Sequence, residues 1–272
     1  MREQRQGTRT TETITISRAE YEELKSVVLL DTAHPTAIRR SVAFSEAILN
    51  GRTIVEDLEA VRALDAAEAL RVLESGCVPV LADPAGTVIA QLGPDAVVDA
   101  VLAKRNLGTT IDMAPVVVGV GPGFTAGTDC NAVVETQRGH TLGRVYLEGS
   151  ALPNTGIPGT IAGIGSERVL RAPADGLFRA ISAIGDHVEA NEMVGEVLTE
   201  DGPVPMLASI RGVLRGILPD NTKVHRGMKS GDIDPRDDPS YCRTVSDKAL
   251  AVGGGVLEAV LGLGREDADS ET

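Results

Sequence analysis

The stretch Ala114–Gly127, APVVVGVGPGFTAG, carries the strongest fold signal in the chain. Three consecutive valines after Pro115 are typical of a buried strand, and four glycines follow within nine residues: Gly119, Gly121, Gly123 and Gly127. In α/β proteins, a buried strand that runs into a glycine-rich turn brings bare backbone N–H groups close to an anionic ligand. The same pattern also fits a tight strand-to-helix turn that binds nothing. We therefore expect a strand over 116–118, followed by the leading candidate for a ligand site.

The composition predicts ordered domains with aliphatic cores. Of the 272 residues, 42% are hydrophobic but only 2% are aromatic. The formal net charge of −13 argues against a nucleic-acid partner, because phosphate would be repelled. No apolar run reaches the roughly 18 residues of a membrane-spanning helix, and the polar N-terminus lacks a signal-peptide core. These features predict a cytoplasmic protein without a nucleic-acid or membrane partner.

The cysteines and histidines do not form a recognisable metal pattern. The three cysteines are far apart and include no CxxC pair, and the four histidines show no ligand spacing. We therefore expect neither a disulfide framework nor a metal site.

Strands and helices alternate over residues 27–150, which predicts an α/β layer with mostly parallel strands. The expected strands cover 27–30, 53–58, 78–81, 116–118 and 143–148. The expected helices cover 36–49, the stretch between Asp65 and Gly76, and 95–105. A capping box predicts a further short helix over 18–25, after a polar tail over 1–13. The Gly- and Pro-rich stretch over 149–165 is expected to be a linker.

An internal repeat with an offset of 36 residues occupies the next part of the chain. Residues 169–197 align without gaps to residues 205–233. Neither half can bury one face alone, so we expect the two halves to interlock. The pattern resembles the barrel-sandwich hybrid of biotinyl and lipoyl domains, although the junction LTEDGPVP over 198–205 has no lysine to modify. We therefore expect a structural module and not a carrier.

The last segment is expected to form a helix capped by Ser246. Its three consecutive glycines, 253–255, would each cost about 1 kcal/mol relative to alanine inside a helix. That cost predicts either a break or a close approach by another backbone. The expected domains are a variable segment 1–26, a truncated Rossmann-like α/β domain 27–165, a β-rich barrel-sandwich module 166–236, and a C-terminal helix with an acidic tail 237–272.

The candidate ligand-binding residues surround the glycine loop or carry positive charge near it. The loop matches neither GxGxxG nor a Walker motif. Asp129 is expected to cap a following helix whose N-terminus would favour an anion. The cations near helix ends could instead be simple partners of the helix dipole. Glu135 and His140 form a weaker pair for proton transfer. The complete ligand-binding set is Arg39, Arg40, Lys104, Arg105, Asn106, Gly119, Gly121, Gly123, Phe124, Gly127 and Asp129.

Several long blocks, in order, resemble the selenium-dependent molybdenum hydroxylase system accessory family. The resemblance covers about residues 31–263 and is carried by PTAIRRSVAFSEA (35–47), LAKRNLGT (102–109), APVVVGVGPGFTAG (114–127), ETQRGHTLGRVYLEGSALPNTGIPG (135–159), RAPADG (171–176), GDIDPR (231–236) and SYCRTVSDKALAVGGGVLEAVL (240–261). It implies a Rossmann-like fold with a barrel-sandwich module. It also implies a role in the maturation of a molybdenum hydroxylase.

The N-terminus departs from this family pattern. Members typically begin with a strand and a glycine-rich loop resembling VKGAGDLATG, whereas TETITISRAEYEELKS stands here over 11–26. Either the glycine loop after residue 118 is the surviving phosphate site, or nucleotide binding is lost, or the start of the gene is wrongly assigned.

The resemblance implies an accessory factor that binds an anionic ligand, a nucleotide or a molybdopterin-type molecule, at Gly119–Gly127. Its expected partners are a molybdenum hydroxylase or the assembly factors of that enzyme, and a homo-oligomer is a further candidate. Two alternatives stay open: an NAD(P)-dependent oxidoreductase-like enzyme, and a scaffold protein without a ligand.

Overall fold

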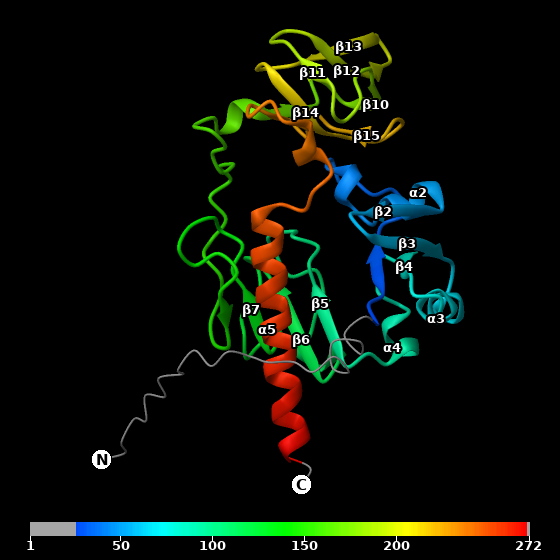
Figure 1. The fold of residues 1–272 in the computed structure, drawn as a ribbon, viewed down its shortest axis with the longest axis vertical. Coiled ribbons are helices and arrows are strands. Elements are labelled where there is room, and N and C mark those ends of the chain that lie inside the picture. The colour runs from blue at the N-terminus through cyan, green and yellow to red at the C-terminus, as the bar shows by residue number, and fades with distance from the viewer. Residues whose placement is uncertain (1–25, 271–272) are drawn as a thin grey trace.

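Within residues 26–270, the fold contains four sheets of four strands each, two in an α/β part and two in a β-sandwich (Figure 1). The computed structural model describes residues 26–270. The expected tail over 1–13 and the expected helix over 18–25 lie outside these residues. Figure 1 shows the sandwich at one end of the molecule, with the two α/β sheets side by side beneath it.

The first α/β sheet has the strand order β1-β4-β3-β2. Strand β4 pairs in parallel with β1 and β3, and β2 joins β3 as an antiparallel hairpin. Ala47 and Ile48 of α2 cover one face of the sheet, and Ala69 of α3 covers the other together with residues near α4. The elements are β1 (Leu29–Asp31), η1 (Arg40–Val42), α2 (Glu46–Asn50), β2 (Arg52–Val55), β3 (Leu58–Ala63), α3 (Ala66–Glu74), β4 (Val78–Ala82) and α4 (Ile89–Leu92).

The second α/β sheet has the order β5-β6-β7-β8. Its central strand β6 is buried along its whole length, with Val118 opposite Val98 on one side and Ala132 on the other. Strands β5, β6 and β7 are parallel, and β8 is antiparallel. The elements are β5 (Ala96–Asp99), η2 (Ile111–Met113), β6 (Val116–Val120), β7 (Ala132–Val134) and β8 (Val145–Tyr146).

One long helix, α5 (Asp247–Ser270), runs down the face of this second sheet (Figure 1). Its residues Val252, Val256, Ala259 and Val260 pack on alternate side chains of β6 and β7. The three glycines do not break α5. Gly255 is buried because the backbone of Gly143 passes close to it, so the close approach predicted from the sequence is confirmed.

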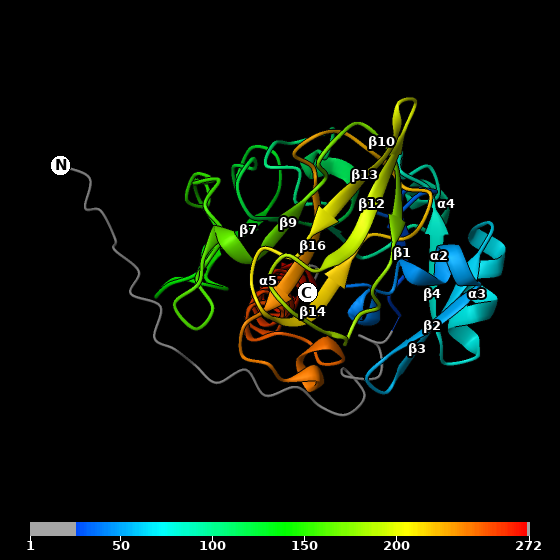
Figure 2. The ribbon, with the colours of Figure 1, turned by 90° about the horizontal axis from the view of Figure 1, so that it is seen from above.

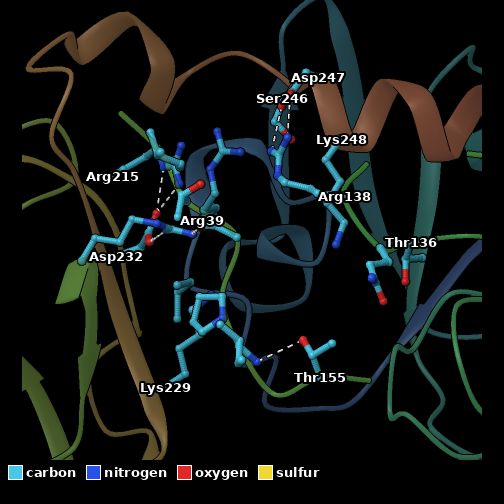
Figure 3. A pocket seen from close by; sticks show the side chains of 18 of the residues that line it. Arg39, Thr136, Arg138, Thr155, Arg215, Lys229, Asp232, Ser246, Asp247 and Lys248 are labelled. Atoms are coloured by element: carbon cyan, nitrogen blue, oxygen red, sulfur yellow. Dashed lines mark hydrogen bonds and ion pairs between the residues drawn. The ribbon is translucent and has the colours of Figure 1, made fainter. Parts of the chain in front are cut away.

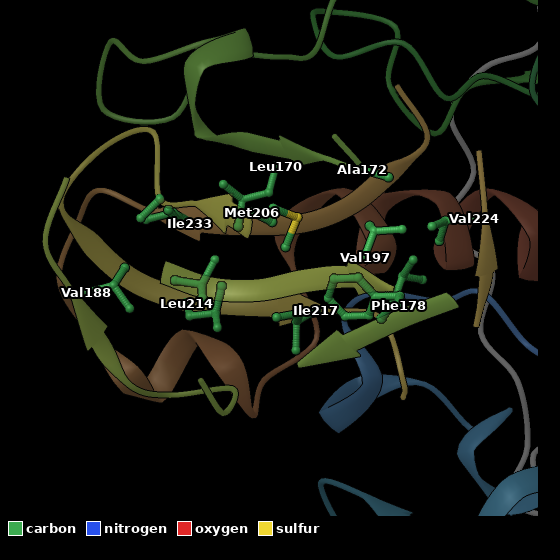
Figure 4. Packing of buried hydrophobic residues seen from close by; sticks show 13 residues of the cluster. Leu170, Ala172, Phe178, Val188, Val197, Met206, Leu214, Ile217, Val224 and Ile233 are labelled. Carbon is green, nitrogen blue, oxygen red and sulfur yellow. The ribbon is translucent and has the colours of Figure 1, made fainter. Parts of the chain in front are cut away.

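The sandwich consists of two antiparallel sheets, β13-β12-β10-β15 and β11-β14-β16-β9. Phe178, Leu214 and Ile233 are almost completely buried between them (Figure 4). The elements are η3 (Ser166–Arg168), β9 (Val169–Arg171), β10 (Gly176–Ala180), β11 (His187–Val188), β12 (Met193–Thr199), β13 (Gly202–Leu207), β14 (Gly212–Ile217), β15 (Lys223–Val224), β16 (Lys229–Asp234) and η4 (Pro239–Cys242).

The interlocking predicted from the 36-residue repeat is confirmed. Strands β9 to β12 come from the first half of the repeat, and β13 to β16 come from the second. Each sheet contains two strands from each half. Viewed from above, the sandwich strands lie over the N-terminal end of α5 (Figure 2). Among the helices of residues 26–270, none is long and apolar enough to cross a membrane.

The expected fold class, a truncated Rossmann-like domain followed by a barrel-sandwich hybrid, is wrong as a description of this chain. Residues 27–150 do not form one parallel layer but two separate sheets, each ending in an antiparallel strand, β2 or β8. The observed architecture is an α/β fold with mixed and antiparallel sheets.

Two expected helices are also wrong. The stretch 95–105 starts with β5, because adjacent β-branched residues Val97 and Val98 favour a strand paired with β6. The stretch 36–49 forms only η1 and the short α2. There, the carbonyl of Ile38 accepts a hydrogen bond from the backbone N–H of Ile217 at 2.8 Å. This tertiary contact holds the chain in a non-helical path.

Candidate functional site

A cleft of about 930 Å³ lies where the sandwich, the second α/β sheet, the linker over 149–165 and the start of α5 meet (Figure 3). Its charge is opposite to that of the whole chain, which carries a formal net charge of −13. Two carboxylates line it, Asp232 and Asp247. Eight cationic side chains line it as well: Arg39, Lys104, Arg138, Arg168, Arg215, Lys229, Arg236 and Lys248.

The sandwich wall of the cleft holds a charge network with more cations than carboxylates. Asp232 accepts from Arg168 and from Arg215, whose Nε lies 2.9 Å from Asp232 Oδ2. Asp234 accepts from Arg215 Nη1 at 2.9 Å and from Arg236 Nη2 at 2.6 Å. All of these side chains except that of Arg236 are buried. Three guanidinium groups therefore share two carboxylates.

The network leaves hydrogen-bond donors unused. The Nε of Arg168 is buried and has no hydrogen-bond partner among residues 26–270. Asp234 stays ionised: burial opposes this, but hydrogen bonds from Arg236 and the charges of Arg215 and Arg236 outweigh it and lower the pKa of its carboxyl group. Asp234 therefore contributes a negative charge near neutral pH, and the three guanidinium groups of the wall still outnumber the two carboxylates.

Arg39 adds a further guanidinium beside this wall. Its Nη2 donates to the backbone carbonyls of Tyr241 and Thr244 at 2.9 and 3.0 Å. Its Nε is buried without a hydrogen-bond partner in the part of the chain that the structure describes. Burial lowers the pKa of Arg39, and the like charge of Arg215 lowers it further. Arg39 is thus crowded by positive charge and incompletely hydrogen-bonded.

The opposite wall is built by the loop after β7 and by the first turn of α5 (Figure 3). Arg138 donates two hydrogen bonds to Asp247, with Nη1–Oδ2 and Nη2–Oδ1 distances of 2.7 and 2.9 Å. These bonds and the charge of Arg138 hold the pKa of Asp247 well below its usual range. Lys248 follows directly in the helix, and Lys104 lines the same cleft.

Two lysines show that the walls influence each other electrostatically. Burial lowers the pKa of Lys248, and the charges of Lys104, Arg138 and Lys229 lower it further. Lys229 comes from the sandwich wall, so its charge reaches Lys248 across the cleft. Desolvation by its surroundings also lowers the pKa of Lys229 itself. The cleft disfavours additional positive charge and favours an anion.

Glu135 holds the loop and the linker that form this wall. Its side chain is fully buried and accepts backbone hydrogen bonds from Thr136 and Gln137 at 2.7 Å and from Leu152 at 2.8 Å. Both carboxylate oxygens are therefore occupied by the backbone. His140, considered with it for proton transfer, lies exposed in the following turn. The geometry gives Glu135 a positioning role.

The space beside three glycines of the predicted loop is filled by the protein itself. A Cβ atom on Gly119 would lie 2.5 Å from Phe124, one on Gly121 2.8 Å from Thr136 Oγ1, and one on Gly123 2.6 Å from the backbone of Arg105. Gly121 and Gly123 also adopt positive φ angles of 84° and 114°. Gly119, Gly121 and Gly123 therefore permit close packing. Beside Gly127, by contrast, no atom of the described residues other than its chain neighbours lies within 4 Å of a Cβ position.

The loop does not lead into the expected helix. It continues into strand β7, and Asp129 accepts a hydrogen bond from the backbone N–H of Thr125 at 2.8 Å, so it stabilises the loop and caps no helix. Phe124 is part of the core beneath it. Pro122 of this loop lines the cleft. Ligand binding by the loop stays a prediction.

The structure brings only some of the predicted cations to the cleft. Arg39 and Lys104 line it. Arg40 instead donates to both carboxylate oxygens of Glu46 at 2.9 Å. The exposed Arg105 packs its backbone against the loop, and the Asn106 side chain accepts from the backbone N–H groups of residues 108 and 109 at 2.8 Å. Their roles as ligand-binding residues stay predictions.

Six further cations of the cleft lie outside the ligand-binding set predicted from the sequence: Arg138, Arg168, Arg215, Lys229, Arg236 and Lys248. One signal was available. Arg215 stands inside the apolar run GVLRGIL, and Asp232 and Asp234 flank the apolar Ile233 in GDID at the end of the repeat. Charged residues are almost never fully buried unless they are paired, so such positions indicate a buried ion network.

No family model matches the chain. The uncharacterized protein YqeB of Escherichia coli K12 is 48% identical over 235 residues, which are 86% of this chain and 43% of that protein. The chain thus spans less than half the length of this curated relative.

Solved structures show only a distant likeness. A succinylglutamate desuccinylase/aspartoacylase from Rhodobacter sphaeroides is 14% identical with a TM-score of 0.27, and the ectoine utilization protein EutE from Ruegeria pomeroyi, with product bound, is 13% identical with a TM-score of 0.26. Each match covers 76% of this chain and 84% of the other. An aspartoacylase family protein from Mesorhizobium loti matches over 25% of this chain and 23% of its own, at 18% identity and a TM-score of 0.23.

These comparisons correct the identification made from the sequence. No family model matches the chain, and the relative YqeB is uncharacterized, so neither comparison shows the selenium-dependent molybdenum hydroxylase accessory family. The assignment to that family, the maturation role and the selenium and molybdenum connection are therefore withdrawn. The NAD(P)-dependent alternative is also wrong, because β6 leads through its loop into a strand and not into a dinucleotide-binding helix. The alternative of a scaffold protein without a ligand stays a prediction.

Proposed function

We propose that this chain binds a small organic polyanion, bearing phosphate or carboxylate groups, in the basic cleft. The observation that carries the proposal is the cationic excess of the sandwich wall, where three guanidinium groups share the buried carboxylates of Asp232 and Asp234. An uncompensated buried charge costs several kcal/mol, and an anion would supply the missing countercharge. Arg39 and Arg168 support this, because both line the cleft and their Nε atoms have no hydrogen-bond partner within residues 26–270.

The side-chain chemistry fits phosphate and carboxylate groups in particular. The planar fork of arginine matches both groups with paired hydrogen bonds, and lysine adds a compact charge. The volume of about 930 Å³ lies near the upper end of the range for small-molecule sites. A nucleic-acid polymer is disfavoured by the net charge of −13. The cytoplasmic location expected from the sequence is part of this proposal.

The proposal is restricted to binding. The names of the solved structures refer to aspartoacylase and desuccinylase proteins, and TM-scores below 0.3 do not carry those activities to this chain. Among the described residues, no group of three or more histidine, cysteine, aspartate or glutamate side chains could hold a metal ion.

Isothermal titration with inorganic phosphate, pyrophosphate and citrate tests the proposal. We expect saturable binding that weakens as salt is raised, since the contacts are ionic. Arg39→Gln and Lys229→Gln should each weaken binding by roughly tenfold or more, the effect of losing one charge-assisted hydrogen bond. Lys223→Gln is the matched control, because Lys223 is exposed on β15 and does not line the cleft.

Two results would refute the proposal. One is the absence of a binding signal for all three anions up to millimolar concentration at low salt. The other is equal weakening by the control Lys223→Gln and by Lys229→Gln, because this would mean that general surface charge and not the cleft attracts the anion.

A further inference from the structure

The cations of the cleft fall into two groups on facing walls. The sandwich group contains Arg168, Arg215 and Lys229, with Arg39 beside them. The helix group contains Lys104, Arg138 and Lys248. Figure 3 shows Arg215 and Lys229 on one side of the cavity and Arg138 and Lys248 on the other. A single small anion held on one wall would leave the other group uncompensated.

The linker places apolar side chains along the same cleft. Leu152 and Ile157 line it and are 45% and 77% exposed. Two hydrogen bonds nevertheless hold the linker in place. The backbone N–H of Leu152 donates to Glu135, and Arg168 Nη2 donates to the carbonyl of Gly159 at 3.0 Å. A single exposed leucine is ordinary. Here the apolar side chains share one cavity with two separate cationic groups.

We propose that the ligand is a bis-anion: an organic molecule with an anionic group at each end and an apolar middle, which bridges the two walls. This inference rests on the proposed function and deepens it. One anionic group would compensate the sandwich group, where Arg39 and Arg168 have unused donors. The other would lie against Lys104 and Lys248, and the apolar middle would contact the linker.

Asp247 already occupies part of the helix-side position. It pairs with Arg138, although its own side chain is 71% exposed. An exposed ion pair contributes little to stability, so the second anionic group of the ligand can replace this carboxylate at small cost. Asp247 thus competes with the second anionic group of the ligand for Arg138. Asp247→Asn should therefore strengthen binding of a bis-anion.

A series of α,ω-dicarboxylates and α,ω-diphosphonates with increasing methylene spacers tests the inference, each compared with the mono-anion of the same chain length. We expect affinity to pass through a maximum at one spacer length, with the best bis-anion roughly tenfold or more tighter than its mono-anion. Lys248→Gln should weaken the bis-anion by a larger factor than the mono-anion. Lys223→Gln again serves as the control, and circular dichroism of each variant verifies folding.

The possible failures are distinguishable. If inorganic phosphate binds but affinity is independent of spacer length, or if Lys248→Gln weakens mono- and bis-anions by the same factor, the bis-anion inference is wrong and the proposed function stands. If neither phosphate nor any member of the series binds, the proposed function itself is wrong.

Discussion

Substituting Gly255 in α5 should destabilise the protein even though alanine favours helices. Gly255 is buried against the backbone of Gly143: a Cβ atom at position 255 would lie 2.2 Å from the carbonyl oxygen of Gly143 and 2.9 Å from Val134 Cγ1. Gly143 has little freedom to move, because its backbone N–H donates to the Glu135 carbonyl at 2.9 Å and its φ is 79°. The helix or the loop must therefore shift.

The neighbouring residue provides the matched control. Gly254 is exposed in the same helix, and outside the helix's own backbone no atom of residues 26–270 lies within 4 Å of where its Cβ would stand. Gly254→Ala should stabilise the protein by about 1 kcal/mol, the difference in helix propensity. Gly255→Ala gains the same propensity but loses about 1–3 kcal/mol through overpacking. The two variants should therefore differ in free energy of unfolding by about 1–3 kcal/mol.

Urea unfolding followed by far-ultraviolet circular dichroism measures this difference. A displaced α5 would carry Lys248 with it, so the anion affinity of the cleft should also fall in Gly255→Ala but not in Gly254→Ala. If Gly255→Ala is as stable as Gly254→Ala, the proximity of Gly143 does not constrain the helix and the explanation is refuted.

Four further predictions have defined outcomes. Asp232→Ala leaves two buried guanidinium groups without their shared carboxylate and should cost about 3–5 kcal/mol in urea unfolding, whereas a loss below 1 kcal/mol would contradict a buried network. Phe178→Ala opens a cavity in the sandwich core, where Phe178 is 1% exposed, and should cost about 3–5 kcal/mol by the same assay, unless the core collapses to fill it. The folded-state pKa of Asp234 is lowered below 3.8, so the ionised carboxylate stabilises the protein above pH 3.8. This stabilisation is lost as the pH falls through the lowered pKa. The melting temperature of Asp234→Asn should therefore change less with pH in the acid range than that of the unsubstituted protein. The pKa values of Lys229 and Lys248 are lowered from 10.5, so anion affinity should begin to fall at a lower pH than ordinary lysines would give, and a titration that stays flat up to pH 10.5 would contradict their role.

Local signals in the sequence predicted the elements whose formation depends on neighbouring residues. Asp65 caps α3 by accepting from the Glu68 backbone, as its position before the helix indicated. The buried strand around Val117 follows from a run of β-branched residues. The repeat predicted the interlocked sandwich, because equivalent strands recur at a fixed offset. In each case the information lies within a short stretch or a fixed period.

The site could not be predicted in the same way, because its residues come from distant parts of the chain. Arg39 contacts residues about 200 positions later, and Arg168 pairs with Asp232, 64 positions away. The glycine loop was predicted to bind a ligand because glycines leave backbone N–H groups accessible. In the structure, Phe124 packs against Gly119, and the backbone of Arg105 packs against Gly123. Neither contact can be read from the sequence around the loop.

The exchange of strands between the two repeats also dictates an order of events during synthesis. Strand β10 pairs with β15 and β9 pairs with β16, so one sheet is incomplete until Val224 has been made and the other until Asp234 has been made. The first α/β sheet needs nothing beyond Ala82 and can assemble earlier. During synthesis on a ribosome, strands β9 to β12 therefore cannot complete the sandwich until strands β13 to β16 have been made. Long-range pairing of this kind slows folding.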